Sequence, residues 1–391
     1  SMPSSQSHDV AVIGSGVFGA WIAYFLRKSG VSVLLLDAYG PANARASSGG
    51  ESRIIRMGYG ADEIYTRWSL RALPLWKALF GEAGRPELFQ QTGVLWIAHD
   101  KYQYALDTLA ALQEHKIPHE RLSLVGLRKH YPQISFDEDA WGIFEPESGV
   151  LLARRAVQAV VEQAQKIGVE YQAAAVLAPG NNTRKITSLQ TATGETISAG
   201  AFVFACGPWL GSLFPQVLGD RIFPSRQEIF FFGVPAGETR FAQPALPTGL
   251  YLKDEFYGMP DLESRGLKVA DDRHGPRVDP DTQSRIASAE ALDAARTFVA
   301  RRFPTLKNAP VVEMRVCQYE NTSNGDLLID RHPQFDNVWL VGGGSGHGFK
   351  HGPSLGEYVA ARVTETQAAK NEIEPRFSLA TKQTVQNRSV H

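Results

Sequence analysis

The sequence predicts an α/β fold in two parts: a discontinuous dinucleotide-binding domain of the Rossmann type, and an α+β domain with a mixed β-sheet. A glycine-rich turn at 14–19 lies between a buried strand and a helix. Strand signals dominate the middle of the chain, and a second strand, glycine loop and helix follow at 338–365. Strands from the start, the middle and the end of the chain are therefore expected to share one sheet.

The N-terminal segment predicts a βαβ unit of about 30 residues. Apolar and β-branched residues at 9–13 and 31–36 are typical of buried strands, and Asp37 closes the second one. A helix is expected over 17–28, because apolar side chains recur there at helical spacing, namely Ala20, Trp21, Ala23, Tyr24 and Leu26.

The later elements follow from the same local signals. Helices are predicted at 62–79, 154–167, 288–303 and 354–365. Strands are predicted at 169–176, 201–205, 226–233 and 338–341, with shorter signals near Leu250 and Leu267, and with an antiparallel pair at 186–189 and 195–197. A hairpin region is predicted at 88–98, and the polar tail after residue 370 is expected to pack loosely.

This order of elements predicts the domain boundaries. We assign 1–88, 145–220 and 315–391 to the dinucleotide-binding domain. The segments 89–144 and 221–314 are assigned to the substrate domain.

Composition sets the broad class of the protein. The chain has 391 residues, 43% of them hydrophobic and 21% charged, which is typical of a globular protein with two or three domains. A formal net charge of −1 gives no basic footprint for nucleic acid or an anionic membrane. Neither a signal-peptide pattern nor the roughly 18–20 apolar residues of a membrane span is found. Two cysteines, Cys206 and Cys317, exclude a disulfide framework, which favours a reducing compartment, so we expect a cytoplasmic protein. No metal, membrane or nucleic acid is expected as a partner.

The turn at 14–19 reads Gly-Ser-Gly-Val-Phe-Gly and matches the G-x-G-x-x-G motif. Gly14 permits the tight turn, Gly16 lets the backbone approach a pyrophosphate, and Gly19 allows close packing of the helix on the strand. The helix N-terminus offers free N–H groups to phosphate oxygens, and Asp37 is placed to accept from a ribose hydroxyl. The motif predicts dinucleotide binding without deciding between FAD and NAD.

Four further segments point to one family. They are 52–60 (SRIIRMGYG), 144–151 (FEPESGVL), 317–319 (CQY) with 328–333 (LIDRHP) downstream, and 344–350 (GSGHGFK). Together with the glycine motif, they resemble the FAD-dependent amine oxidases of the D-amino acid oxidase superfamily, in the branch of monomeric sarcosine oxidase and N-methyl-tryptophan oxidase. The resemblance runs from about residue 9 to residue 363, and RIIR and GHGFK are its most specific parts.

The resemblance implies FAD rather than NAD, a Rossmann-like FAD-binding domain, and a substrate domain whose mixed sheet covers the flavin ring. It implies a thioether between the flavin and Cys317, whereas Cys206 matches no functional position and is expected in the core. The backbone N–H groups of the glycine loop around His347 are expected to matter more than its imidazole. The implied cofactor contacts are Gly14, Gly16, Val17, Phe18, Gly19, Asp37, Ala38, Ser48, Val176, Gly207, Cys317, Gly346, Gly348, Phe349 and Lys350.

The resemblance also implies a set of basic residues with separate tasks. Arg56 and Lys350 match a pair that binds the substrate carboxylate, in which an arginine fork and a lysine point charge hold the anion. Lys268 matches a lysine linked to oxygen activation, and Arg53 matches a catalytic arginine beside the flavin. A cation near the flavin would stabilise the anions that form during the reaction.

Departures from the family pattern limit what the resemblance says about the substrate. Tyr257 and Tyr319 match tyrosines that line the substrate cavity, but Asp272 replaces an active-site histidine and is expected to face the substrate. Ser48 and Gly49 stand where relatives often carry two histidines. Sarcosine itself is therefore no better a candidate than a larger or differently charged secondary amino acid.

The expected activity is that of an FAD-dependent oxidase of N-methylated or other secondary amino acids. Hydride passes to the flavin, the imine hydrolyses, and oxygen reoxidises the flavin and yields hydrogen peroxide. The alternatives are a dehydrogenase that uses another electron acceptor, a non-catalytic FAD-binding subunit and, more remotely, an NAD-dependent dehydrogenase. A monomer acting on a small amino acid and oxygen is expected.

Overall fold

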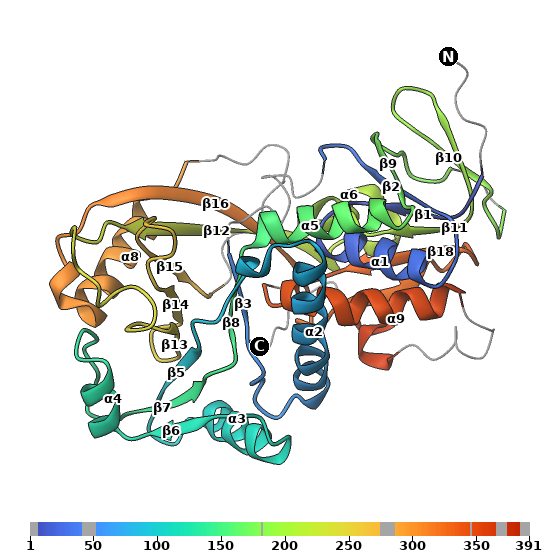
Figure 1. Ribbon diagram of the computed structural model, residues 1–391. Coiled ribbons are helices and arrows are strands. Elements are labelled where there is room, and N and C mark those ends of the chain that lie inside the picture. Colours follow the sequence, from blue (N-terminus) through green and yellow to red (C-terminus); the bar gives the residue numbers. More distant parts are fainter. Residues whose placement is uncertain are drawn as a thin grey trace.

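The computed structural model describes residues 7–40, 52–180, 183–273, 286–344, 346–364 and 374–383. These residues form two large sheets, helices packed on them, and a third sheet of three short strands (Figure 1). None of the helices in this part of the chain is long and apolar enough to cross a membrane.

The first sheet carries the parallel strands of a nucleotide-binding fold. β1 pairs in parallel with β2 and β11, and β11 pairs in parallel with β18. The sheet therefore joins strands from the start, middle and end of the chain, which confirms the predicted α/β class. Within the described residues its order is β17 (Leu328–Arg331), β18 (Val338–Gly342), β11 (Thr196–Phe204), β1 (His8–Ile13), β2 (Val33–Asp37) and β9 (Glu170–Ala173), with β10 (Ser188–Gln190) paired to β11.

Helices α1 (Val17–Lys28), α2 (Glu63–Glu82), α5 (Ala153–Lys166) and α9 (Gly352–Thr364) pack together beside this sheet (Figure 1). Trp21 lies at the contact of α1 with α9 and is buried. A Cβ atom on Gly356 would lie 2.8 Å from the Trp21 backbone, so the close approach of these two helices requires glycine. A separate apolar cluster around Phe204 and Phe214 includes Leu210 of α6 (Leu210–Leu213) and Leu218 of α7 (Pro215–Leu218).

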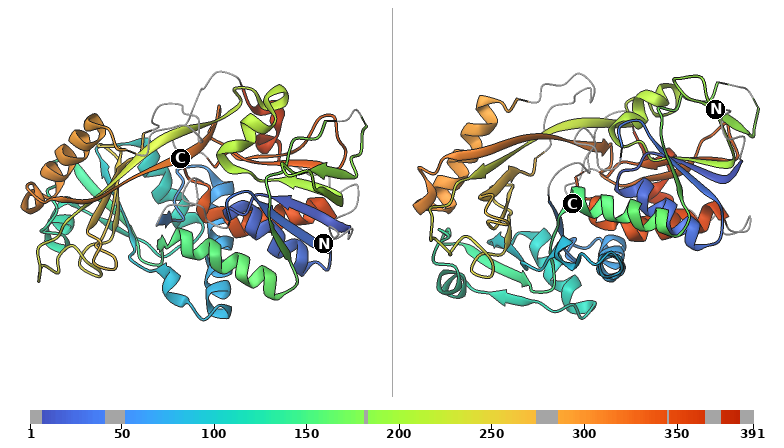
Figure 2. Two further views of the ribbon diagram at one scale, coloured as in Figure 1. Left: turned by 90° about the horizontal axis from the view of Figure 1, so that it is seen from above. Right: turned by 45° about the horizontal axis from the view of Figure 1, so that its top comes forward.

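The second sheet is mixed. β13 pairs in parallel with β5, whereas all the other neighbouring strands of this sheet pair antiparallel among the described residues. Two long strands, β12 and β16, lead from this sheet towards the first one (Figure 2). The strand order among the described residues is β16 (Val311–Thr322), β12 (Ile222–Phe232), β15 (Leu267–Asp271), β14 (Phe256–Met259), β13 (Thr248–Tyr251), β5 (Val94–His99), β7 (Ala140–Glu145) and β6 (Glu120–Leu122).

The remaining elements flank these sheets. α8 (Ala289–Arg302) packs on β12 and β15, and α4 (Leu124–His130) packs on β6 and β7. α3 (Gln103–Glu114) contributes buried Leu109 and Leu112 to the main apolar cluster. The small sheet consists of β3 (Arg53–Ile55), β8 (Gly149–Leu151) and β4 (Phe89–Gln90). The division into domains at 1–88, 145–220 and 315–391 against 89–144 and 221–314 stays a prediction.

Two local predictions are wrong. The region 88–98 is not a hairpin, because β4 pairs with β8 in the small sheet whereas β5 pairs with β7 and β13. The strands predicted at 195–197 and 201–205 are one continuous strand, β11. In both places the pairing partners are distant in sequence, and local pattern does not reveal them.

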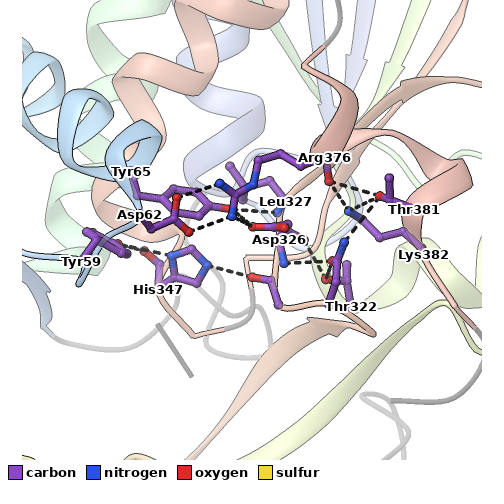
Figure 3. A network of polar contacts seen from close by, with 12 residues as sticks. Tyr59, Asp62, Tyr65, Thr322, Asp326, Leu327, His347, Arg376, Thr381 and Lys382 are labelled. Carbon is purple, nitrogen blue, oxygen red and sulfur yellow. Dashed lines mark hydrogen bonds and ion pairs between the residues drawn. The ribbon is translucent and has the colours of Figure 1, made fainter. Parts of the chain in front are cut away.

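The polar tail does not pack loosely over residues 374–383. Phe377 is fully buried, and Arg376 forms ion pairs with Asp62 at 2.7 Å and with Asp326 at 2.8 Å. Asp326 also accepts a hydrogen bond of 2.6 Å from the Tyr65 hydroxyl. Figure 3 shows this network joining the C-terminal segment to the start of α2. Arg376, in a tail that was expected to pack loosely, therefore pairs with two acidic side chains that are largely shielded from solvent.

Candidate active site

A cavity of about 330 Å³ lies at the carboxyl ends of β1, β2 and β11. Open parallel sheets bind nucleotides at this edge. Its walls come from the glycine turn, the end of β2, the loop after β11 and the loop after β18. The predicted cofactor residues that line it are Gly14, Gly16, Val17, Phe18, Asp37, Ala38, Val176, Gly207, Gly346, Gly348 and Phe349.

The glycine turn leaves no room for a side chain at Gly14 or at Gly19. Gly14 has a φ of +107°, and a Cβ there would lie 2.1 Å from the Ala205 carbonyl oxygen. A Cβ on Gly19 would lie 1.7 Å from the Gly14 oxygen, so Gly19 serves helix packing and does not line the cavity. α1 begins at Val17 inside the cavity wall, which places a helix N-terminus at the site.

Asp37 is held rigidly at the end of β2. Its Oδ2 accepts from the Ser15 backbone N–H at 2.7 Å and from the Ser15 hydroxyl at 2.9 Å. Its Oδ1 accepts from the Tyr39 backbone N–H at 2.8 Å. A carboxylate oxygen can accept more than one hydrogen bond, so Asp37 keeps capacity for a ribose hydroxyl.

Arg53 and Tyr319 also line the cavity. The Arg53 guanidinium lies 5.6 Å from the centre of the Tyr319 ring and also interacts with the Cys317 side chain. Cys317 does not line the cavity itself, but it lies two residues before Tyr319 on β16 and so faces the same side of the strand. A Cβ on Gly346 would meet the Tyr319 ring at 2.7 Å.

Arg56 and Lys350 are brought together around Tyr59. The Arg56 guanidinium lies 4.1 Å from the centre of the Tyr59 ring and donates a hydrogen bond to the Gly58 carbonyl. Lys350 Nζ donates to the Tyr59 hydroxyl at 2.6 Å and to the His347 carbonyl at 2.5 Å. Both side chains are buried, Arg56 at 6% and Lys350 at 3% exposure. A buried guanidinium and a buried lysine amine on one tyrosine form a site suited to an anion.

The His347 imidazole makes two polar contacts of its own, and the expectation that the loop acts mainly through its backbone N–H groups stays a prediction. Its Nε2 lies 3.0 Å from the Gly325 carbonyl and its Nδ1 lies 3.3 Å from the Tyr59 hydroxyl. Figure 3 shows Tyr59 and His347 side by side. The ring therefore ties the glycine loop to the tyrosine that Lys350 contacts.

Glu145 organises the Arg56 segment and was missed by the sequence analysis. Its Oε1 accepts from the Met57 backbone N–H at 2.8 Å, and its Oε2 accepts from the Gly58 N–H at 3.2 Å and the Trp96 indole at 2.7 Å. It is 1% exposed. The only signal was its place in the family-like segment 144–151. Tyr104, beside Arg56 on an unpredicted helix, was missed as well.

Lys268 lies on β15 and is 2% exposed. Its Nζ donates to the Ser52 hydroxyl at 2.6 Å and to the Ser52 carbonyl at 3.1 Å, and it lies 5.8 Å from the centre of the Tyr257 ring. Asp272 follows the same strand and is close enough to interact electrostatically with Arg56 and Lys350. These residues gather near Arg53, but none of Lys268, Tyr257 or Asp272 lines the large cavity.

Three other positions need comment. Ser48 lies outside the described residues. Cys206, which was expected in the core, packs against an apolar cluster and also lines the large cavity, because β11 ends there, and burial raises the pKa of its thiol. Glu320 also lines the cavity and was not predicted.

The described residues fit a dinucleotide such as FAD. The turn that a Cβ would fill, the helix N-terminus, the anchored Asp37, Arg53 and Tyr319 all belong to the wall of one cavity. The glycine turn suits a pyrophosphate and Asp37 suits a ribose hydroxyl.

Comparisons with known proteins agree with this geometry. The family model described as FAD dependent oxidoreductase (DAO) matches residues 9–362. Monomeric sarcosine oxidase of Bacillus sp. (strain NS-129) is 31% identical over 367 residues, covering 92% of this chain and 94% of that protein. N-methyl-L-tryptophan oxidase of Salmonella heidelberg (strain SL476) is 28% identical over 363 residues, covering 91% and 94%.

Solved structures share the fold at lower identity. The crystal structure of L-proline dehydrogenase from P. horikoshii superimposes with a TM-score of 0.80 at 21% identity, covering 93% of this chain and 95% of that chain. NikD, an amino acid oxidase of nikkomycin biosynthesis, superimposes with a TM-score of 0.77 at 20% identity, covering 96% and 98%. With a family match over nearly the whole length and a relative above 30% identity, the chain belongs to the DAO family of FAD-dependent oxidoreductases.

Proposed function

We propose that the protein is an FAD-dependent oxidase of N-methylated or other secondary amino acids that reduces oxygen to hydrogen peroxide. The observation that carries the proposal is the buried pair of basic side chains, Arg56 and Lys350, close to Arg53 of the cavity wall. The matches to a sarcosine oxidase and an N-methyl-L-tryptophan oxidase support the same substrate class. As in a monomeric relative, we expect a single chain to form the complete site.

Arg56 and Lys350 would bind the substrate carboxylate. Burial lowers the pKa of Lys350 well below its ordinary value, and the positive charge of Arg56 lowers it further. A carboxylate between the two side chains would offset both effects and restore the proton on Lys350 Nζ. Arg56 keeps its charge under all ordinary conditions, so it provides the constant part of the anion site.

The remaining side chains would orient the amine and support electron transfer. FAD, when bound, supplies the acceptor for the hydride of a C–H bond next to the substrate nitrogen and the path of two electrons to oxygen. Burial raises the pKa of Tyr257 and of Tyr319, so both phenols stay neutral and act as hydrogen-bonding groups. Lys268 Nζ would stabilise negative charge on oxygen, and Arg53 would do so beside the ring. Asp272 would face the substrate amine or side chain, and water would hydrolyse the imine product.

We further propose that Cys317 forms the thioether to the flavin. Arg53 interacts with the Cys317 side chain, which places a positive charge beside the sulfur. Its common strand face with Tyr319 supports this assignment.

Acid precipitation of the wild-type holoprotein is expected to leave the yellow colour in the pellet. Cys317→Ser should release all flavin into the supernatant, because a hydroxyl does not form the thioether. Cys206→Ser is the matched control, since Cys206 also lines the cavity, and it should keep its flavin in the pellet. Release of the flavin from the wild-type protein would disprove the covalent link and leave the proposed activity untouched.

The proposed activity is tested by anaerobic bleaching of the flavin spectrum with a panel of N-methylated, cyclic and primary amino acids. Secondary amino acids should bleach the spectrum, and readmitted air should restore it with one hydrogen peroxide per turnover. Absence of bleaching across the panel would contradict the proposal. Bleaching followed by turnover only with an artificial acceptor would identify a dehydrogenase instead.

A further inference from the structure

Glu320 is a buried carboxyl group in the wall of the FAD cavity to which no role has been assigned. It lies near the end of β16 and is 6% exposed. Its Oε1 accepts from the Gly343 backbone N–H at 2.9 Å, in a space that only glycine leaves open, since a Cβ on Gly342 would lie 2.1 Å from this oxygen. One oxygen of the carboxyl group is therefore anchored in the loop after β18.

The other oxygen is available to a ligand. Oε2 has no hydrogen-bond partner among the described residues, and it lies 3.9 Å from the place that a Cβ on Gly207 would occupy. Gly207 lines the same cavity at the carboxyl end of β11. A cofactor that fills the cavity would shield this oxygen from solvent, and a shielded polar atom without a partner is costly, so a hydrogen bond to the cofactor would satisfy it.

We propose that Glu320 binds FAD as a neutral carboxylic acid, donating the proton on Oε2 to an oxygen of the dinucleotide while Oε1 stays on Gly343. An ionised carboxylate at this position would only accept, and it would repel the phosphate charges of the ligand. The acid form satisfies both oxygens and adds a donor to the glycine-rich wall.

The electrostatic surroundings favour the neutral form. Burial raises the pKa of Glu320 to about 8. Cys206 at the end of β11 interacts electrostatically with Glu320, and burial raises the pKa of its thiol, whereas Asp37 at the end of β2 lines the same cavity. Arg53 and Tyr319 line the same cavity from β3 and from β16 itself. On β12 the residue paired with Glu320 is Pro224, which carries no charge.

The sign of the pH dependence follows from proton linkage. Below about pH 8 the free protein already holds the proton, so FAD affinity is independent of pH through this group. Above that value FAD binding must take up a proton, and the dissociation constant should rise about tenfold per pH unit. Retention of FAD is therefore expected to fail on the alkaline side.

The test uses full-length protein carrying Cys317→Ala, so that any covalent link is removed and flavin exchange is measurable. Flavin fluorescence gives the FAD dissociation constant from pH 6.5 to pH 9, with folding checked by circular dichroism. The Cys317→Ala protein should lose affinity above about pH 8. Added Glu320→Gln keeps an acceptor and a donor without an ionisable proton, so affinity should become independent of pH. Added Glu320→Leu should weaken binding about tenfold at pH 7, the value of one hydrogen bond.

Glu313→Gln is the matched control. Glu313 lies on the same strand, but it pairs with Arg265 away from the cavity, so this change should leave the pH profile as it was. The proposal is overturned if Glu320→Gln retains the alkaline loss of affinity, or if Glu320→Leu binds FAD as tightly as the Cys317→Ala parent at pH 7. Neither readout uses an amine substrate, so the proposal stands or fails separately from the proposed activity.

Discussion

Replacing Lys268 with methionine is expected to slow reoxidation of the reduced enzyme by oxygen about 10²–10³-fold, the usual cost of removing one preorganised charge or donor from an active site. Anaerobic reduction by substrate should change only a few-fold. Methionine keeps the length and apolar stem of lysine, so the change removes charge with little loss of packing. The asymmetry is the essential part of the prediction, because negative charge develops on oxygen only in the oxidative half of the reaction.

The structure explains why Lys268 is suited to this task. Its ammonium group is held by two hydrogen bonds to Ser52, the residue before Arg53, and it is almost fully excluded from solvent. A charge fixed in a dry site needs no reorganisation when the anion forms. Paired hydrogen bonds also fix its position relative to Arg53 in the wall of the FAD cavity.

Stopped-flow absorbance of the flavin measures the two half-reactions separately. Lys253→Met is the control, since Lys253 follows β13 of the same sheet, is half exposed and pairs with Asp137 and Asp139. It should leave both rates unchanged. Equal slowing of reduction and reoxidation in Lys268→Met would show that Lys268 has a general structural role and would refute the assignment.

The cofactor-binding part of the site could be predicted from the sequence because its residues lie close together in the chain. Gly14 adopts a positive φ of +107°, Gly19 is required by its contact with Gly14 in the same turn, and Asp37 follows 18 residues after Gly19 in the same βαβ unit. The spacing of apolar residues also predicts the helix and the strands around them. The βαβ unit was therefore predicted to within one or two residues at each element boundary.

The substrate end could not be read in this way because its geometry depends on distant pairings. Glu145 reaches the Arg56 segment only because β7 pairs with β5 in the second sheet. Glu320 reaches Gly343 only because β16 ends beside the loop after β18. From the sequence alone, these glutamates cannot be distinguished from surface residues, and Cys206 cannot be distinguished from a core residue. The family resemblance identified Arg56 and Lys350, whereas the tertiary structure identified the side chains that position them.

Replacing Arg56 with methionine is expected to lower kcat/KM for carboxylate substrates about 10²–10³-fold, mainly through KM, because a buried charge-assisted contact is lost. Arg56→Lys should recover only part of the loss, since lysine keeps the charge but not the bidentate fork. The matched substrate is an N-methyl amine of the same side chain without the carboxylate. Its kcat/KM should be low with the wild-type enzyme and nearly unaffected by either variant. An equal loss for the acid and the amine would refute carboxylate binding by Arg56.

The pH dependence of KM adds a test that disrupted packing would not imitate. Substrate binding requires the proton on Lys350, so KM should rise as pH increases through the pKa of Lys350 in the free enzyme. The positive charge of Arg56 holds that pKa down, in addition to burial. Removing the charge in Arg56→Met should therefore raise the pKa and move the increase of KM to higher pH, while Arg56→Lys leaves it near the wild-type position. KM profiles across neutral and alkaline pH measure the displacement, and identical profiles for Arg56→Met and Arg56→Lys would show that the two cations do not share one site.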